Sequence, residues 1–280
     1  MVQKPLLEVV ELCITLQYRR SDIMKAEIVE RFMEYIKVTN ENIDKEHICC
    51  AISNNNDIQV SSKKEWLKEQ FREGLVFLKR AERGKCFIEY LPAENAWNPI
   101  TADGYMYIDC LWVAGSFKGH GYGADLLDAC LEDSKNKGKK GLCILSSEKK
   151  KPFLSDPKFL RYKGFKVCDK ADNGIQLWYL PFAADAPLPE FKECARHPHI
   201  EEKGYVLYYT SQCPFNAKYV PIVEEVARKN GVSFQAIHLQ SKEEAQNAPT
   251  PVTTYALFYN GAYLTNEQMN DRKFLKLLSK

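Results

Sequence analysis

Long apolar segments are missing from this sequence of 280 residues. No apolar run approaches the roughly eighteen residues that a helix needs to cross a membrane, so a membrane protein is not expected. An excess of basic over acidic residues is also lacking. The formal net charge is only +2, which argues against a general nucleic-acid binder. The N-terminus lacks the basic segment that precedes the apolar core of a secretory signal. These absences favour a cytoplasmic protein.

A cysteine framework is lacking as well, although the chain has ten cysteines. They are scattered, and Cys86, Cys110, Cys143 and Cys168 lie in or beside expected strands. Buried free thiols in a reducing cytosol account for this pattern better than disulfides do. His, Cys and carboxylate side chains do not cluster at the spacing of metal ligands, so no metal site is expected.

A strand that leads into a glycine-rich loop is the most informative motif present. Residues 105–113 (YMYIDCLWV) have the aromatic and β-branched side chains typical of a strand. The loop at 118–123 (KGHGYG) follows, and a helix is expected after it to about residue 136. Alternate glycines let backbone N–H groups turn toward a ligand, and the helix N-terminus favours a pyrophosphate. The spacing fits neither a dinucleotide fingerprint nor a P-loop.

The loop at 118–123 resembles the cofactor loop of the GNAT family of N-acetyltransferases, Arg/Gln-x-x-Gly-x-Gly/Ala, with Lys118 in place of Arg or Gln. An expected strand at 141–147, a helix that ends in Gly164-Phe165 and a last strand at 175–182 follow in the order of that family. The resemblance implies an α/β (α+β) fold with a mixed central sheet over residues 33–182. It also implies acetyl-CoA as cosubstrate and a small amine as acceptor.

The same resemblance implies a coenzyme A site along the strand and the loop. The main chain of the strand would pair with the pantetheine arm and offer an N–H group to the developing oxyanion. The lysine-rich stretches at 135–140 and 149–151 would either help to bind the 3′-phosphate or form solvated charge runs. The residues expected to bind the cofactor are Leu111, Trp112, Val113, Lys118, Gly119, His120, Gly121, Tyr122, Gly123 and Ala124.

The acceptor amine must lose a proton before it attacks, so a carboxylate is the expected general base. Glu89 ends an expected strand and Glu94 lies in the next loop, so these are the candidates. For each, a surface carboxylate without a catalytic role is the alternative. Tyr90 and Trp97 are expected to line the acceptor pocket. The carboxylates and aromatic residues of this region suit a cationic small amine.

The closing helix of the family often has a tyrosine that protonates the departing thiolate. The corresponding residue here is Leu160, which places that role in doubt. Tyr162, two positions further on, is retained as a catalytic candidate, although it would face elsewhere on a helix. Tyr122, Tyr90 or water are the alternatives. Earlier in the chain, helices are expected at 41–53 and 63–74.

The composition changes after the last of these strands. Residues 183–202 begin with AADAPLP, which indicates a linker. Residues 203–280 then have strands and helices in the order β-α-β followed by β-β-α. This order resembles thioredoxin-like domains, glutaredoxins in particular, and acetyltransferases with a YoaP-like C-terminal domain share the two-domain arrangement. Pro251 stands where thioredoxin-like domains have a cis-proline.

Cys213 lies at the start of a helix in this region, where a cysteine usually has a lowered pKa. Asn216 replaces the second cysteine of a Cys-x-x-Cys motif, so a dithiol cycle within the motif is excluded. A monothiol role and a fold kept only for binding stay open. A second hypothesis follows for the whole chain, a coenzyme A- or thiol-binding redox module that uses Cys213 without acetyl transfer.

The N-terminal segment at 1–32 is expected to form a helical extension. Its apolar residues are dense between positions 6 and 16, with acidic residues interleaved. Such a segment would pack on the next domain or mediate a homodimer, and the sequence does not decide between them.

Overall fold

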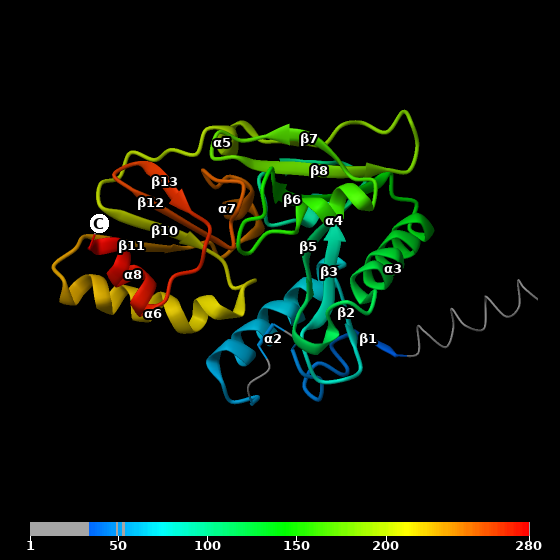
Figure 1. Cartoon of the computed structure of the whole chain (residues 1–280), viewed down its shortest axis with the longest axis horizontal. Coiled ribbons are helices and arrows are strands. Elements are labelled where there is room, and N and C mark those ends of the chain that lie inside the picture. Colours follow the sequence, from blue (N-terminus) through cyan, green and yellow to red (C-terminus); the bar gives the residue numbers. More distant parts are fainter. Residues whose placement is uncertain (1–33, 49, 52–53, 280) are drawn as a thin grey trace, which may run out of the picture.

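The computed structural model of the chain describes residues 34–48, 50–51 and 54–279, so the extension expected at 1–32 lies outside the described residues. The larger of its sheets has seven strands in the order β1-β2-β3-β5-β6-β8-β7 (Figure 1). Only β5 and β6 are parallel neighbours, which confirms a mixed sheet. The strands are β1 (Tyr35–Val38), β2 (Val76–Arg80), β3 (Cys86–Pro92), β5 (Tyr105–Val113), β6 (Gly141–Ser147), β7 (Lys166–Lys170) and β8 (Ile175–Pro181).

Helices cover both faces of this sheet. On one face, α3 (Tyr122–Asn136) and α4 (Pro157–Tyr162) bury leucines such as Leu126 and Leu160. On the other face, α2 (Ile58–Gln70) buries Trp66 and Leu67. The residues of each strand alternate between these two cores, because successive side chains point to opposite faces. Whether a side chain faces α3 and α4 or faces α2 therefore depends on its parity, that is, on whether its position along the strand is odd or even.

Of the two helices expected before β2, the first was wrong and the second was right except for its start. Residues 41–46 form turns rather than a helix. The α2 helix begins at Ile58, not at 63, because the Asp57 side chain accepts a hydrogen bond from the Gln59 N–H and so caps its N-terminus. The helix ends in a short 3₁₀ turn, Phe71–Glu73, before Gly74.

The strands β5 and β6 part halfway along their length. Their paired residues run only from Tyr105↔Gly141 to Ile108↔Ile144, although both strands continue beyond these pairs. On the other side of β5, Glu89 of β3 pairs with Cys110 and Tyr90 pairs with Ile108. Asp109 is thus the extra residue of a β-bulge. A bulge bends a strand, and this one lies where β5 turns away from β6.

A four-stranded sheet forms the core of the C-terminal unit, residues 203–280. Its order is β11-β10-β12-β13, with β10 and β11 parallel and the other pairs antiparallel. The order of elements agrees with the sequence prediction, except that α7 was not expected and that no peptide among the described residues, including the one before Pro251, is cis. The elements are β10 (Tyr205–Tyr209), α6 (Pro214–Lys229), β11 (Phe234–His238), α7 (Lys242–Gln246), β12 (Tyr255–Tyr259), β13 (Ala262–Thr265) and α8 (Asp271–Leu278).

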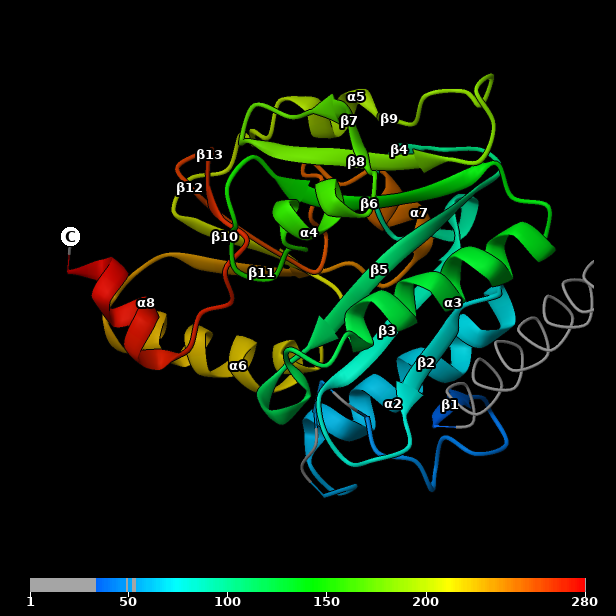
Figure 2. The same ribbon diagram turned by 45° about the vertical axis from the view of Figure 1, so that its right-hand side comes forward.

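The C-terminal unit packs on the α2 side of the larger sheet (Figure 2). Part of the expected linker is structured, because β9 (Glu190–Phe191) pairs with β4 (Ile100–Thr101) and is followed by the short helix α5 (Glu193–Arg196). Close to β4, the Asn98 side-chain N–H donates to the Pro251 carbonyl at 2.9 Å. A direct hydrogen bond between two loops therefore joins the C-terminal unit to the rest of the structure, in addition to the chain itself.

Candidate active site

The glycine-rich loop forms a turn at the N-terminus of α3. Gly119 and Gly121 have φ values of 85° and 82°, in the left-handed region that glycine adopts without strain. Gly121 is also the N-cap of α3 and supplies no side-chain acceptor. The first N–H groups of a helix have no partner within the helix, so these are available to an anion. The side chains of Lys118 and His120 are exposed beside them.

The lysine-rich stretch at 135–140 lies at the opposite end of α3. A helix of fifteen residues is about 22 Å long, so these lysines are far from the loop at 118–123. Lys137 instead pairs with Asp133 at 2.6 Å, and Lys139 pairs with Glu94 at 3.4 Å. Of the two alternatives for this stretch, the structure favours the solvated charge run.

Glu89 lies in the middle of β3, not at its end, and is paired with Lys63 of α2. The Lys63 Nζ donates to Glu89 Oε2 at 2.7 Å, and the side chains are 1% and 2% exposed. The same ammonium donates to the Gln212 carbonyl of the C-terminal unit at 2.8 Å. Burial opposes the ammonium and is the largest single effect, but the charge and hydrogen bond of Glu89, together with Cys50 and Asp109, raise the pKa of Lys63. Burial likewise raises the pKa of Glu89, against the effect of Lys63.

Asp109, the extra residue of the β-bulge, faces the same group of charges. Burial, reinforced by the charge of Glu89, raises the pKa of Asp109 to about 8. Its Oδ1 is inaccessible and has no hydrogen-bond partner among the described residues, while the Gln212 side chain bonds to its carboxyl group. We did not predict this residue, although a single acid within the apolar strand YMYIDCLWV was a visible signal.

The thiol of Cys213 lies in the same interface, with a pKa shifted in the direction opposite to the expected one. Burial raises the pKa of Cys213 to about 11, because it outweighs the N–H groups at the start of α6. The thiol donates to Gln268 Oε1 at 3.5 Å. A thiol with this pKa is almost entirely protonated at neutral pH and is a poor nucleophile.

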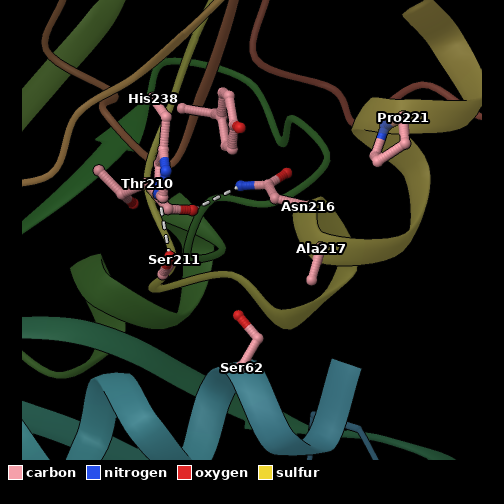
Figure 3. Close-up of a pocket in the computed structure, with 8 residues that line it drawn as sticks. Ser62, Thr210, Ser211, Asn216, Ala217, Pro221 and His238 are labelled. Atoms are coloured by element: carbon pink, nitrogen blue, oxygen red, sulfur yellow. Dashed lines mark hydrogen bonds between the residues drawn. The ribbon is translucent and has the colours of Figure 1, made fainter. Parts of the chain in front are cut away.

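A cavity of about 180 Å³ lies between α2 and the C-terminal unit (Figure 3). Ser62 of α2 forms one wall, and Ser211, Asn216 and His238 are on the opposite side. The Ser211 hydroxyl lies 2.9 Å from His238 Nε2, and the Asn216 side chain donates to the Thr210 carbonyl at 2.9 Å. The C-terminal unit therefore forms the wall of this cavity opposite α2.

The two residues expected to line the acceptor pocket, Tyr90 and Trp97, are both buried. Tyr90 follows Glu89 in β3 and therefore points to the opposite face, where it is buried under α3. Trp97 is 8% exposed and packs with Leu239, Ala245 and Ala248 of the C-terminal unit. Trp97 therefore contributes to the contact between the two sheets.

The other two catalytic candidates are also separate from the buried charges. Glu94 accepts from the Gly104 N–H at 2.7 Å, and this bond and Lys139 lower the pKa of Glu94 although burial opposes them. Tyr162 is 83% exposed, whereas Leu160 is fully buried in the core under α3 and α4. Of the three predicted catalytic residues, only Glu89 lies at the bulge.

Metal ligands and apolar spans were also expected to be absent. Over residues 34–279, apart from the gaps at 49 and 52–53, three or more His, Cys, Asp or Glu side chains do not gather in a geometry that could hold a metal. Over the same residues, the helices are too short or too polar to cross a bilayer. Six of the cysteines described there are free thiols, namely Cys110, Cys130, Cys143, Cys168, Cys194 and Cys213.

Comparisons with known proteins place the chain in a family. Residues 40–151 match the Acetyltransferase (GNAT) family, and residues 233–276 match the YoaP-like family. The chain is 45% identical over 248 residues to the Uncharacterized N-acetyltransferase YoaP of Bacillus subtilis (strain 168), an alignment that covers 88% of this chain and 99% of the relative.

Solved structures of similar proteins include the PaiA N-acetyltransferase of Thermoplasma acidophilum in complex with coenzyme A, with 16% identity, a TM-score of 0.38, and coverage of 53% of this chain and 98% of that one. Another is a GNAT acetyltransferase of Brucella melitensis in complex with acetyl-CoA, with 17% identity, a TM-score of 0.35, and coverage of 55% and 90%. On the sequence matches, the chain belongs to the GNAT family of N-acetyltransferases and has a YoaP-like C-terminal region.

Proposed function

We propose that the chain transfers the acetyl group of acetyl-CoA to a small primary amine, by direct attack of the amine on the thioester. The observation that carries this proposal is the bulge at Asp109, where β5 leaves β6. Beyond it, the main chain of residues 111–113 pairs with β3 but not with β6. That free edge suits the pantetheine arm, and the loop at 118–123 suits the pyrophosphate.

Asp109 is the general base in this proposal. A base works best when its pKa lies near the working pH, and the pKa of Asp109 is raised to about 8. Its Oδ1 is unpartnered but inaccessible in this conformation, and in this proposal it accepts a proton from the ammonium once the acceptor has entered the site. The amine nitrogen then attacks the carbonyl carbon, the amide C–N bond forms, and the C–S bond breaks to release coenzyme A as thiolate. The negative charge of Glu89 assists by stabilising an ammonium group at the site.

In this proposal a water molecule protonates the departing thiolate and takes in exchange the second proton of the attacking nitrogen, so that the neutral amide forms and coenzyme A leaves as the thiol. Leu160 is buried in the core, and Tyr162 of the same helix is in solvent. Tyr90 lies under α3, on the far face from Glu89 and Asp109. These positions support water over Tyr90 and Tyr162 as the proton donor, and Tyr122, at the start of α3, stays an alternative.

We also propose that residues 203–280 form a thioredoxin-like domain after an acetyltransferase domain at 33–182 and a linker at 183–202. The order and directions of its strands support the assignment. In this proposal the domain completes the acceptor site, because Gln212 contacts Lys63 and Asp109. The raised pKa of Cys213 disfavours the alternative of a redox module that acts without acetyl transfer.

The test is the release of coenzyme A from acetyl-CoA by the purified chain with a panel of amines that includes polyamines, aminoglycosides, amino acids and peptide N-termini. Turnover with at least one cationic amine is expected. Calorimetry under reducing conditions measures acetyl-CoA binding separately. Absence of acetyl-CoA binding would refute the proposed function, and unaltered turnover by Cys213→Ser would refute the redox alternative.

A further inference from the structure

The Lys63 ammonium is surrounded in the way that proteins bind a primary amine. It donates to the Glu89 carboxylate at 2.7 Å and to the Gln212 carbonyl at 2.8 Å. It also lies 4.3 Å from the centre of the Trp66 ring, within the range of a cation–π contact. A carboxylate, a carbonyl and an aromatic face together recognise an ammonium group rather than a metal ion. We call Glu89, Gln212 and Trp66 the ammonium cage.

The position of the cage coincides with the position of the proposed chemistry. Glu89 pairs across the sheet with Cys110, the residue after Asp109. The charges of Lys63 and Glu89 both act on the carboxyl group of Asp109. An ammonium in the cage is therefore beside the proposed base, at the point where β5 and β6 part. An acceptor amine must occupy this region to reach the thioester and lose its proton.

We propose that the ammonium cage is the subsite for the amine of the acceptor, and that Lys63 fills it in this conformation. The inference rests on the proposed function and specifies its substrate class. Because the occupant is a primary ammonium on an unbranched aliphatic chain, the acceptor has the same chemistry, an alkyl primary amine. Lys63 leaves the cage when the acceptor binds, and until then it competes with the acceptor.

Lys79 offers a matched control. It is a buried lysine as well, and it pairs with Glu46 at 2.7 Å. Its Nζ also lies 3.2 Å from His47 Nδ1. This lysine is on β2, and neither it nor Glu46 is among the groups that act on Asp109. Lys79 thus shares burial and ion pairing with Lys63 but not its place at the bulge.

The experiment compares full-length Lys63→Ala and Lys79→Ala with n-propylamine, which has the atoms that alanine removes from a lysine side chain. Lys63→Ala should bind n-propylamine in calorimetry without acetyl-CoA, and should acetylate it at least about tenfold faster than the unsubstituted chain does. Lys79→Ala should show no such gain in acetylation, even if the amine fills its cavity. Equal gains in both variants, or none in Lys63→Ala, would overturn the proposal.

A second measurement covers the case in which Lys63→Ala does not fold unaided, since it leaves Glu89 buried without its partner. n-Propylamine, whose ammonium replaces that of Lys63, should then restore the folded state and turnover, whereas n-propanol, which has a similar shape but no charge, should not. Failure of n-propylamine to restore them, or equal restoration by n-propanol, would overturn the proposal. The panel assay on the unsubstituted chain reports separately on acetyl transfer, so failure of the cage and failure of the proposed function give different results.

Discussion

The cofactor loop at 118–123 and the ammonium cage both adjoin the larger sheet but are built in different ways. The loop at 118–123 is a single stretch of chain that offers backbone N–H groups, and the side chains of Lys118 and His120 are exposed. The cage brings Glu89 of β3 and Trp66 of α2 together with Gln212 of the C-terminal unit, all of them buried. The loop should therefore be sensitive to changes of backbone conformation, and the cage to changes of charge.

The largest effect is expected on the acceptor side, from Asp109→Asn. The amide keeps the shape but cannot take a proton, so kcat should fall by about 10³-fold, within the usual range for a general base. Acetyl-CoA affinity should not change. In the unsubstituted chain, kcat/KM should rise with pH and level off above about 8, as Asp109 loses its proton. A variant that keeps full activity would exclude Asp109 as the base.

On the cofactor side, Gly121→Asp should weaken acetyl-CoA binding by about 10²-fold. The residue has a φ of 82°, which strains an L-residue, and the new carboxylate would repel the pyrophosphate at the start of α3. Calorimetry measures the loss. His120→Ala is the control, because that side chain is exposed and should change affinity less than about threefold. Equal losses in the two variants would show that the backbone is not the binding element.

The variant Glu89→Gln distinguishes the role of Glu89 from that of Asp109. If Glu89 binds the ammonium, KM for the amine should rise about tenfold, the effect of a lost charge-assisted hydrogen bond. The charge of Glu89 also raises the pKa of Asp109, so its removal should move the midpoint of the pH profile below about 8. If the midpoint stays in place while turnover drops by about 10²-fold or more, Glu89 is the base instead.

The contrast between loop and cage also explains what the sequence could predict. Glycines at 119 and 121 act through their own backbone, so a stretch of six residues was enough to locate the loop. The mixed sheet and the order of elements along the chain followed from the family resemblance that this motif and the elements around it carry. The pairing of Lys63 with Glu89 could not be predicted, because the two residues come from different elements and the side of β3 that faces α2 depends on parity.

Tyr90 and Cys213 show the same limit in two further ways. Tyr90 and Glu89 were both assigned to a region that faces the acceptor, yet both lie within β3, where adjacent residues point to opposite faces. The helix N-terminus at Cys213 predicts a lowered pKa only when the thiol is open to water. Burial against the larger sheet reverses the sign, and burial by another part of the chain has no local signature.

The free energy of unfolding should also depend on the protonation of Asp109, with a smaller effect. The pKa of Asp109 is about 8 in the folded state and near 4 in the unfolded chain, so between these values the folded state holds a proton that the unfolded state has lost. Stability must then fall as pH rises through this window, by at most about 1.4 kcal/mol per pH unit for this group. Denaturant unfolding should show Asp109→Asn gaining stability relative to the unsubstituted chain from about pH 4 to about pH 8. A constant difference would contradict the raised pKa.

The smallest effect is expected from Glu94→Gln. Glu94 is a carboxylate close in sequence to Glu89, but it accepts from the Gly104 N–H and pairs with Lys139 at the far end of α3. The glutamine oxygen can still accept the backbone N–H, and a partly exposed ion pair contributes only about 0–1 kcal/mol. We therefore expect kcat and KM to change by less than about twofold and the pH profile to stay in place. A loss of activity comparable to that of Asp109→Asn would move the base to Glu94 and would mean that the acceptor approaches from the loop rather than through the ammonium cage.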